Sequence, residues 1–285
     1  MSHTPGVLIE AEPGIARLLA PNPSPYTFEG TWVHFVGERE VAIIDPGPAI
    51  PAHVDAMVSA IGERPVAAIL ITHTHRDHSP AANALRERTG APVIGCTSLD
   101  LKNLSGAEAS FDHDYTPDRV LTDGDSITVD GRTLIALHTP GHTSNHLCFA
   151  DSEHGIVFTG DHVMGWSTSV VVPPDGSMGA YLRSLDRLRQ REHDRIYYPA
   201  HGPAVTDPQR LVRGIMTHRM QRERQLVRLL EESGPSTIGE LATAAYPALD
   251  ARLLPAARGS VWAHLVDLQE RGLVQHHDEQ WNIAP

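Results

Sequence analysis

Short apolar runs alternate with turn signals through the first 150 residues of the chain. The run Val41–Ile44 stops at Asp45–Gly47, whose Asp-Pro-Gly sequence is typical of the end of a strand. The run Val66–Ile71 has the length and the unbroken apolar character of a strand buried on both faces. Between these runs, apolar residues recur at helical spacing over 52–61 and predict a helix. We therefore expect interleaved strands and helices, with two sheets covered by helices on their outer faces.

The same reasoning extends the pattern to about residue 206. A helix over 81–88 and a short strand over 92–95 follow the second apolar run. Apolar and polar residues then alternate on both sides of Asp130-Gly131, which predicts a hairpin. The remaining predicted elements are strands over 146–149, 155–158 and 195–198 and a helix over 178–191.

The C-terminal part of the chain has a different organisation. After Asp207-Pro208 a long helical stretch runs to about residue 232, where Ser233-Gly234-Pro235 breaks it. Thr237 and Glu240 form a capping-box signal for a helix to about residue 245. A second helix over 251–271 precedes a hairpin near residues 273–283. We expect a catalytic domain over 1–206, a connecting helix over 207–232 and a winged-helix-like domain over 233–285.

The composition narrows the classes of partner. The formal net charge of −12 disfavours a general binder of polyanions, which needs a basic face. The two cysteines, Cys96 and Cys148, are too few for a disulfide scaffold and are expected to be buried thiols. The N-terminus lacks the pattern of a secretory signal, and no apolar run has the length of a membrane-spanning helix. We expect a cytoplasmic protein that does not act at a membrane.

Histidine is unusually frequent, with 18 residues, and several of these histidines follow predicted strands. His73-x-His75-x-Asp77-His78 comes directly after the buried run Val66–Ile71. In such a turn His73 and His75 can share one cation while Asp77 and His78 bind another. His142 can complete the first ligand set, Asp161 can bridge two cations with Gly160 allowing close backbone approach, and His201 offers a last imidazole. Imidazole and carboxylate groups suit zinc, iron or manganese.

Four separated motifs in this order resemble the metallo-beta-lactamase superfamily, over roughly residues 25 to 205. The resemblance implies a four-layer αββα sandwich of the α/β class and two divalent metal ions, with zinc as first choice and iron or manganese as alternatives. It places His73, His75 and His142 on the first metal. It places Asp77, His78 and His201 on the second, with Asp161 as the bridge. The implied reaction is hydrolysis by a metal-bridging hydroxide, which Asp77 would also orient as a catalytic residue.

The stretch 216–225 and the predicted winged helix resemble one subgroup of this superfamily. That subgroup includes single-strand-specific endoribonucleases and acyl-carrier thioesterases. By the resemblance, the segment over 165–178 lines the substrate pocket, so Trp166 and Ser167 are candidate substrate-binding residues. Four residues are candidates for contact with a phosphate or carboxylate, or alternatively belong to a solvated helix face: His218, Arg219, Arg222 and Arg224. His146 is expected to pack beneath the metal site.

Several functions agree with these motifs. The acidic balance favours a small acyl thioester or ester as substrate. The alternatives are a single-strand-specific endoribonuclease acting on RNA and a non-catalytic metal-bearing regulator. A mononuclear iron dioxygenase that acts on persulfides uses related ligands. From Gly234 onward the chain has three Arg and no Lys but six acidic residues. Such a domain lacks the positive charge that phosphate contacts need, so duplex DNA is not expected as a partner. A role in packing or in forming a homodimer fits this domain better.

Overall fold

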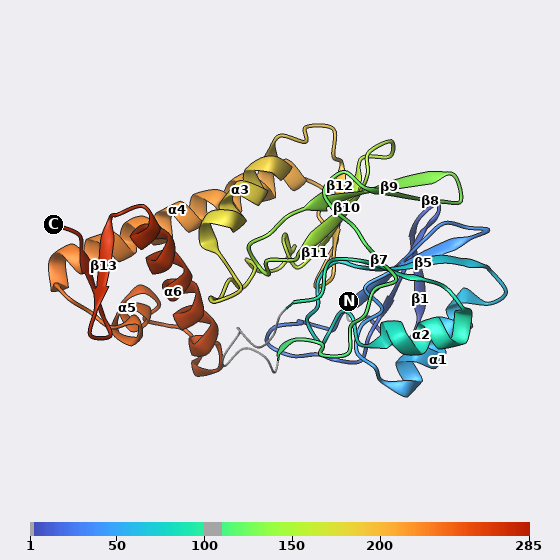
Figure 1. Cartoon of the computed structure of the whole chain (residues 1–285), viewed down its shortest axis with the longest axis horizontal. Coiled ribbons are helices and arrows are strands. Elements are labelled where there is room, and N and C mark those ends of the chain that lie inside the picture. The colour runs from blue at the N-terminus through green and yellow to red at the C-terminus, as the bar shows by residue number, and fades with distance from the viewer. Residues whose placement is uncertain (1–2, 100–109) are drawn as a thin grey trace. The chain divides into compact units, whose positions relative to one another are not determined.

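The computed structural model describes residues 3–99 and 110–285, which form two sheets and a set of helices (Figure 1). The first sheet has seven strands in sequence order. They are β1 (Leu8–Glu12), β2 (Ile15–Leu19), β3 (Trp32–Val36), β4 (Val41–Ile44), β5 (Val66–Ile71), β6 (Val93–Gly95) and β7 (Arg119–Val120). The pairs from β1 to β4 are antiparallel, and those from β4 to β7 are parallel. Parallel pairs need crossovers, and α1 (Pro51–Ile61) and α2 (Ala81–Thr89) supply the first two.

The second sheet has five strands in the order β12-β11-β10-β9-β8. Their bounds are β8 (Ser126–Val129), β9 (Arg132–His138), β10 (Leu147–Asp151), β11 (Ile156–Gly160) and β12 (Ile196–Pro199). Asp130 and Gly131 join β8 to β9 with φ of 46° and 83°. Positive φ at both positions is what a two-residue type I′ hairpin requires, so the hairpin predicted from Asp130-Gly131 is confirmed.

The two sheets pack against each other through one hydrophobic core. Phe35, Ile43 and Leu70 of the first sheet and Phe149 and Phe158 of the second all belong to this core and are almost fully buried. On the first sheet, α1 buries one apolar face and α2 contacts β5 and β6. Figure 1 shows these two helices beside the blue strands. The predicted sandwich of two sheets with helices outside is therefore confirmed.

The C-terminal residues form a helical module that ends in a hairpin. Its elements are α3 (Met178–Arg189), α4 (Pro208–Ser233), α5 (Ile238–Ala245), the 3-10 helix η3 (Ala251–Leu253), α6 (Leu254–Glu270), β13 (Val274–His277) and β14 (Gln280–Ile283). Leu226, Leu241, Leu265 and Trp281 form its own core. The capping box predicted at Thr237 is present at the start of α5. Two helices followed by a paired hairpin confirm the predicted winged helix.

By contacts, the described residues divide into two compact units. The first comprises residues up to Thr139, together with Asn145–Ser167 and Glu192–Pro208. The second comprises Pro140–Ser144, Thr168–Arg191 and Gln209–Pro285. The second unit therefore includes two short segments that precede α4 in sequence, in addition to α4 and the winged helix.

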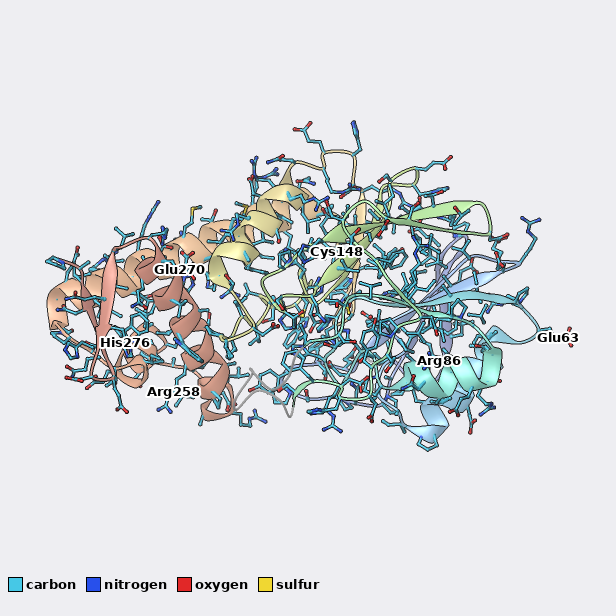
Figure 2. All side chains as sticks on the ribbon, viewed as in Figure 1. Glu63, Arg86, Cys148, Arg258, Glu270 and His276 are labelled. Carbon is cyan, nitrogen blue, oxygen red and sulfur yellow. The ribbon has the colours of Figure 1, made fainter. Side chains whose placement is uncertain are left out.

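Two further sequence expectations can be compared with the structure. Cys96 and Cys148 are free thiols and are buried, as predicted, and Figure 2 labels Cys148 among the side chains of the first unit. Among the described residues, none of the helices combines the length and the apolar character needed to cross a membrane.

Candidate metal centre

The loop after β5 is anchored by a carboxylate at the end of the neighbouring strand β4. Asp45 accepts hydrogen bonds from the backbone N–H of Thr72 at 2.8 Å and from the Thr72 hydroxyl at 2.7 Å. The third hydrogen-bond donor to Asp45 is Nδ1 of His78, at 3.0 Å from Oδ2. Asp45 is 2% exposed and lies in the left-handed region at φ 50°. One buried carboxylate thus fixes both ends of the segment that carries the first candidate ligands.

Nδ1 of four of the five histidines in the candidate ligand set lies at hydrogen-bond distance from an oxygen of the protein. His73 Nδ1 lies 3.0 Å from the Thr72 hydroxyl oxygen, which already donates its own proton to Asp45. His201 Nδ1 lies 3.1 Å from the carbonyl oxygen of Gly30. The corresponding oxygens are Asp45 Oδ2 for His78 and the Val170 carbonyl for His142, at 3.0 and 2.5 Å. Because Nδ1 is the donor in each ring, Nε2 is the nitrogen that can bind a cation.

The ligand atoms fall into two groups, in each of which they lie within 4.8 Å of one another. The first group comprises His73, His75, His142 and Asp161, and the second comprises Asp77, His78 and His201. His73 Nε2 lies 3.0 Å from His75 Nδ1. All seven residues expected as metal ligands are members of these groups.

Asp161 reaches both groups. Asp161 is a member of the first group. Its Oδ1 nevertheless lies 3.5 Å from His78 Nε2 and 3.3 Å from His201 Nε2, and both of these nitrogens belong to the second group. Asp77 Oδ2 lies 3.5 and 3.1 Å from the same two nitrogens. His78 Nε2 is fully buried and, within the described part of the chain, makes no hydrogen bond. A buried nitrogen of this kind, facing two carboxylates, fits a cation between them.

Both the backbone conformation and the space beside Asp161 favour glycine at position 160. Gly160 has φ +48°, and a Cβ at this position would lie 2.7 Å from His146 Nε2 and 2.7 Å from the Thr72 hydroxyl oxygen. His146 Nε2 accepts the backbone N–H of Asp161 at 3.2 Å, so its other nitrogen donates to Thr139 at 2.9 Å. His146 is fully buried and supports Asp161, which confirms the expectation that it packs beneath the site.

The charges in this cluster are strongly coupled. Burial alone would raise the pKa of Asp77 and Asp161, but the neighbouring His78 and His201 outweigh it and hold both well below the usual range. Burial would likewise lower the pKa of the two histidines. The carboxylates outweigh that effect, raising the pKa of His78 well above its usual value and that of His201 to about 10. The buried carboxylate of Asp161 and the half-buried one of Asp77 therefore demand positive charge beside them, and a divalent cation would supply it.

The candidate substrate-binding residues lie in both units. In the first unit, the Trp166 ring stacks on Phe28 with ring centroids 4.9 Å apart. A Cβ on Gly202 would lie 2.6 Å from Trp166 Cδ1, so this ring covers the backbone directly after His201. Ser167 is exposed.

His218 and Arg222 lie on α4 in the second unit. Arg222 donates to the carbonyl of Ala245 at 2.6 Å and lies over the Tyr246 ring, with 4.0 Å from Cζ to the centroid. His218 is half-buried, and burial, followed by the charges of Arg219 and Arg222, lowers its pKa. These contacts give Arg222 a packing role within its unit, and a contact of either residue with substrate stays a prediction.

Sequence reasoning missed two residues of this region. Asp45 was read only as part of a turn, although a carboxylate directly after a buried strand is the same signal that identified Asp161. Phe28 lies in an irregular segment and has no local signal. Its contact with Trp166 joins residues 138 positions apart, which spacing along the chain does not show.

Comparisons with known proteins agree with this geometry. The sequence model of the metallo-beta-lactamase superfamily matches residues 26–201, and that of the beta-lactamase associated winged helix domain matches residues 237–281. An atrochrysone carboxyl ACP thioesterase from Aspergillus chevalieri is 34% identical over 233 residues, which are 80% of this chain and 69% of that protein.

Solved structures show the same fold. A metallo-beta-lactamase family protein from Thermus thermophilus has a TM-score of 0.80 at 24% identity, covering 96% of this chain and 100% of its own. The protein TTHA1623, solved in a di-iron-bound form, has a TM-score of 0.51 at 30% identity, covering 65% of this chain and 92% of its own.

Proposed function

Because the chain belongs to the metallo-beta-lactamase superfamily and is a hydrolase, we propose that it hydrolyses a small acyl thioester at a centre for two divalent metal ions. The observation that carries this proposal is the position of Asp161, whose carboxylate reaches both groups of candidate ligands. A shared carboxylate is the usual link between two cations that act together. The similarity to a protein described as a thioesterase supports the choice of substrate class.

The residues proposed to hold the first ion are His73, His75 and His142, and those for the second are Asp77, His78 and His201, with Asp161 between them. When bound, such ions lower the pKa of water and polarise a carbonyl oxygen. Zinc fits this donor set of imidazoles and carboxylates, and iron fits it as well. The protein similar in structure that was solved with two irons supports a two-metal centre.

Asp77 is the group best placed to orient a water molecule for attack. Its side chain is 27% exposed, whereas those of His78 and His201 are at most 1% exposed. Its pKa lies well below the usual range, because His78 and His201 outweigh the effect of burial. The carboxylate is therefore ionised at neutral pH and can accept a hydrogen bond from water at the accessible edge of the cluster.

Phe28 and Trp166 supply an apolar surface beside the cluster within the first unit. Phe28 is 44% exposed, and Trp166 covers the backbone that follows His201. We propose that this pair contacts the acyl chain of the substrate. Replacing Trp166 with alanine is then expected to raise KM for a long acyl thioester more than for a short one, because apolar burial scales with chain length.

The test compares a short acyl thioester with a labelled single-stranded RNA, using protein of measured metal content. Asp77→Asn is expected to lower thioester turnover by at least about 100-fold. The matched control is Asp55→Asn, because Asp55 is an exposed carboxylate that pairs with Arg88 on the surface. Metal-dependent cleavage of the RNA without thioester turnover would replace this proposal with the endoribonuclease. Full thioester turnover by Asp77→Asn would refute the role of Asp77.

A further inference from the structure

The turn that carries His142 is tied to the segment that precedes α3. Both belong to the second compact unit, as the stretches Pro140–Ser144 and Thr168–Arg191. The backbone N–H of Ser144 donates to Asp175 at 2.9 Å. His142 itself donates from Nδ1 to the carbonyl of Val170 at 2.5 Å. The position of the Val170 carbonyl therefore determines which way the His142 ring faces and which of its nitrogens can bind metal.

A buried arginine on α4 holds the residue directly before Val170. Arg219 donates one N–H of its guanidinium to the carbonyl of Ser169 and another to the hydroxyl of Ser260 on α6, the latter at 2.9 Å. Its guanidinium also lies over the Tyr181 ring, 5.4 Å from the centroid. The Ser169 carbonyl and the Val170 nitrogen share one peptide plane, so fixing the first orients the start of Val170.

Arg219 is an unusual residue to bury. It is 2% exposed, and among the residues that the structure describes no carboxylate pairs with it. A guanidinium that leaves water without a counter-ion is costly, so a residue that only filled this space would be apolar. Its rigid fork of donors, by contrast, can join two separate oxygens at fixed positions. The arginine is thus suited to holding the Ser169 carbonyl rather than to packing alone.

Helix α6 holds the same segment at a second point. A Cβ on Gly259 would lie 2.5 Å from Cγ2 of Val172, so this side chain fits directly against the helix backbone. Ser260, the next residue, is the one that accepts from Arg219. Helices α4 and α6 therefore contact the segment before α3 on both sides of Val170, at Ser169 and at Val172.

We propose that Arg219 is a positioning residue for the metal ligand His142, acting through Ser169 and Val170. This inference rests on the proposed metal centre. It gives α4 and α6 of the C-terminal module a role in metal binding, in addition to their role in the packing of the winged helix. The chain of contacts runs from α4 to the Ser169 carbonyl, through the peptide plane that ends at the Val170 nitrogen, and across the Val170 Cα to the carbonyl that receives the His142 proton.

The same helix offers a matched control one turn away. Arg222 also donates to a backbone carbonyl and also lies over a tyrosine ring, but its contacts are with Ala245 and Tyr246 at the end of α5. Arg219→Met and Arg222→Met remove comparable interactions from α4. Only the first removes an interaction with the segment that holds His142.

The experiment is a calorimetric titration of metal-free protein with Zn²⁺, together with the melting temperature of each variant. Wild type is expected to bind two equivalents. Arg219→Met is expected to weaken one of the two sites by about 10- to 100-fold and to leave the other unchanged. Arg222→Met is expected to keep both affinities. Arg219→Lys keeps the charge but loses the fork, so it should weaken the same site and provides the measurement if Arg219→Met does not fold.

The outcomes separate this inference from the proposed function. The role of Arg219 would be overturned if wild type binds two equivalents and Arg219→Met binds both as tightly. If only Arg219→Lys folds, the same result with that variant would overturn it. Equal weakening by Arg222→Met would also overturn it, because the effect would then be a general one of α4. Failure of wild type to bind a second equivalent would instead refute the two-metal centre.

Discussion

Replacing Gly160 with alanine tests whether the backbone beside Asp161 is as constrained as the structure indicates. Gly160 has φ +48°, and the added methyl group would lie 2.7 Å from both His146 Nε2 and the Thr72 hydroxyl oxygen. Each of these neighbours is itself fixed by a hydrogen bond, to Asp161 in one case and to Asp45 in the other. Neither can move without disturbing a residue of the metal centre or its support.

The cost has two parts. Left-handed backbone costs an alanine about 1–2 kcal/mol relative to glycine. Forcing a methyl group into a packed interior costs about 1–3 kcal/mol more. We therefore expect the free energy of unfolding of Gly160→Ala to fall by about 2–5 kcal/mol. Zinc affinity should fall as well, because Asp161 donates its backbone N–H to the displaced His146.

The assay is urea unfolding of metal-free protein, with Gly90→Ala as the matched control. Gly90 also has a left-handed backbone, at φ +73°, but a Cβ there would meet nothing within 4 Å. The control therefore reports the backbone part alone, and the difference between the two variants reports the steric part. A Gly160→Ala variant that loses no more stability than Gly90→Ala, and binds zinc as wild type does, would refute the reasoning.

Three further predictions concern the support of the centre, the effect of pH and the removal of metal. Asp45→Asn places an amide against donors that need a carboxylate, so zinc affinity in a titration should fall by about 10- to 100-fold; wild-type affinity would contradict the role of Asp45. Burial, and then the charge of Arg17, lowers the pKa of His34 to about 3. In the unfolded chain the pKa of His34 is near 6.5, so below that pH the unfolded state binds a proton that the folded state does not bind. The free energy of unfolding therefore decreases as pH falls below 6.5. This loss is about 2 kcal/mol at pH 5 relative to pH 8. His34→Phe should remove that part of the pH dependence in urea unfolding at the two pH values, and an unchanged difference would show that His34 does not cause it. Removing zinc with a chelator should lower the free energy of unfolding. The loss is about 2.7 kcal/mol for each site, if the free zinc concentration beforehand was about 100 times the Kd of that site. A melting temperature that does not change with added chelator would contradict tight binding.

The sequence predicted best those features that depend on neighbours along the chain. The strand Val66–Ile71 was predicted with its observed bounds, because an unbroken apolar run meets a polar segment directly. The hairpin at Asp130-Gly131 was predicted because those residue types suit positive φ. Strand β1, in contrast, was not predicted. Its sequence LIEAE is largely exposed and has too short an apolar pattern to mark a strand.

The same division applies to the candidate centre. The ligand residues follow apolar runs, which is a local signal, and the structure brings them into two groups. Of their supports, only His146 was predicted to pack beneath the site. The contacts of Asp45 and Arg219 could not be predicted, since they join residues that are distant in the sequence. Asp45 and Thr72 are 27 positions apart, and Arg219 and Ser169 are 50 positions apart. Which carbonyl or carboxylate faces a given histidine is decided by how the strands and helices pack, and no spacing along the chain shows it.

The most direct test of the two-metal account is the rate of acyl thioester hydrolysis measured against equivalents of zinc added to metal-free protein. If Asp161 joins two ions in one centre, turnover should continue to rise up to the second equivalent and then stay constant. Full activity at one equivalent would contradict the two-metal centre. The absence of thioester hydrolysis at two equivalents would contradict the proposed substrate class.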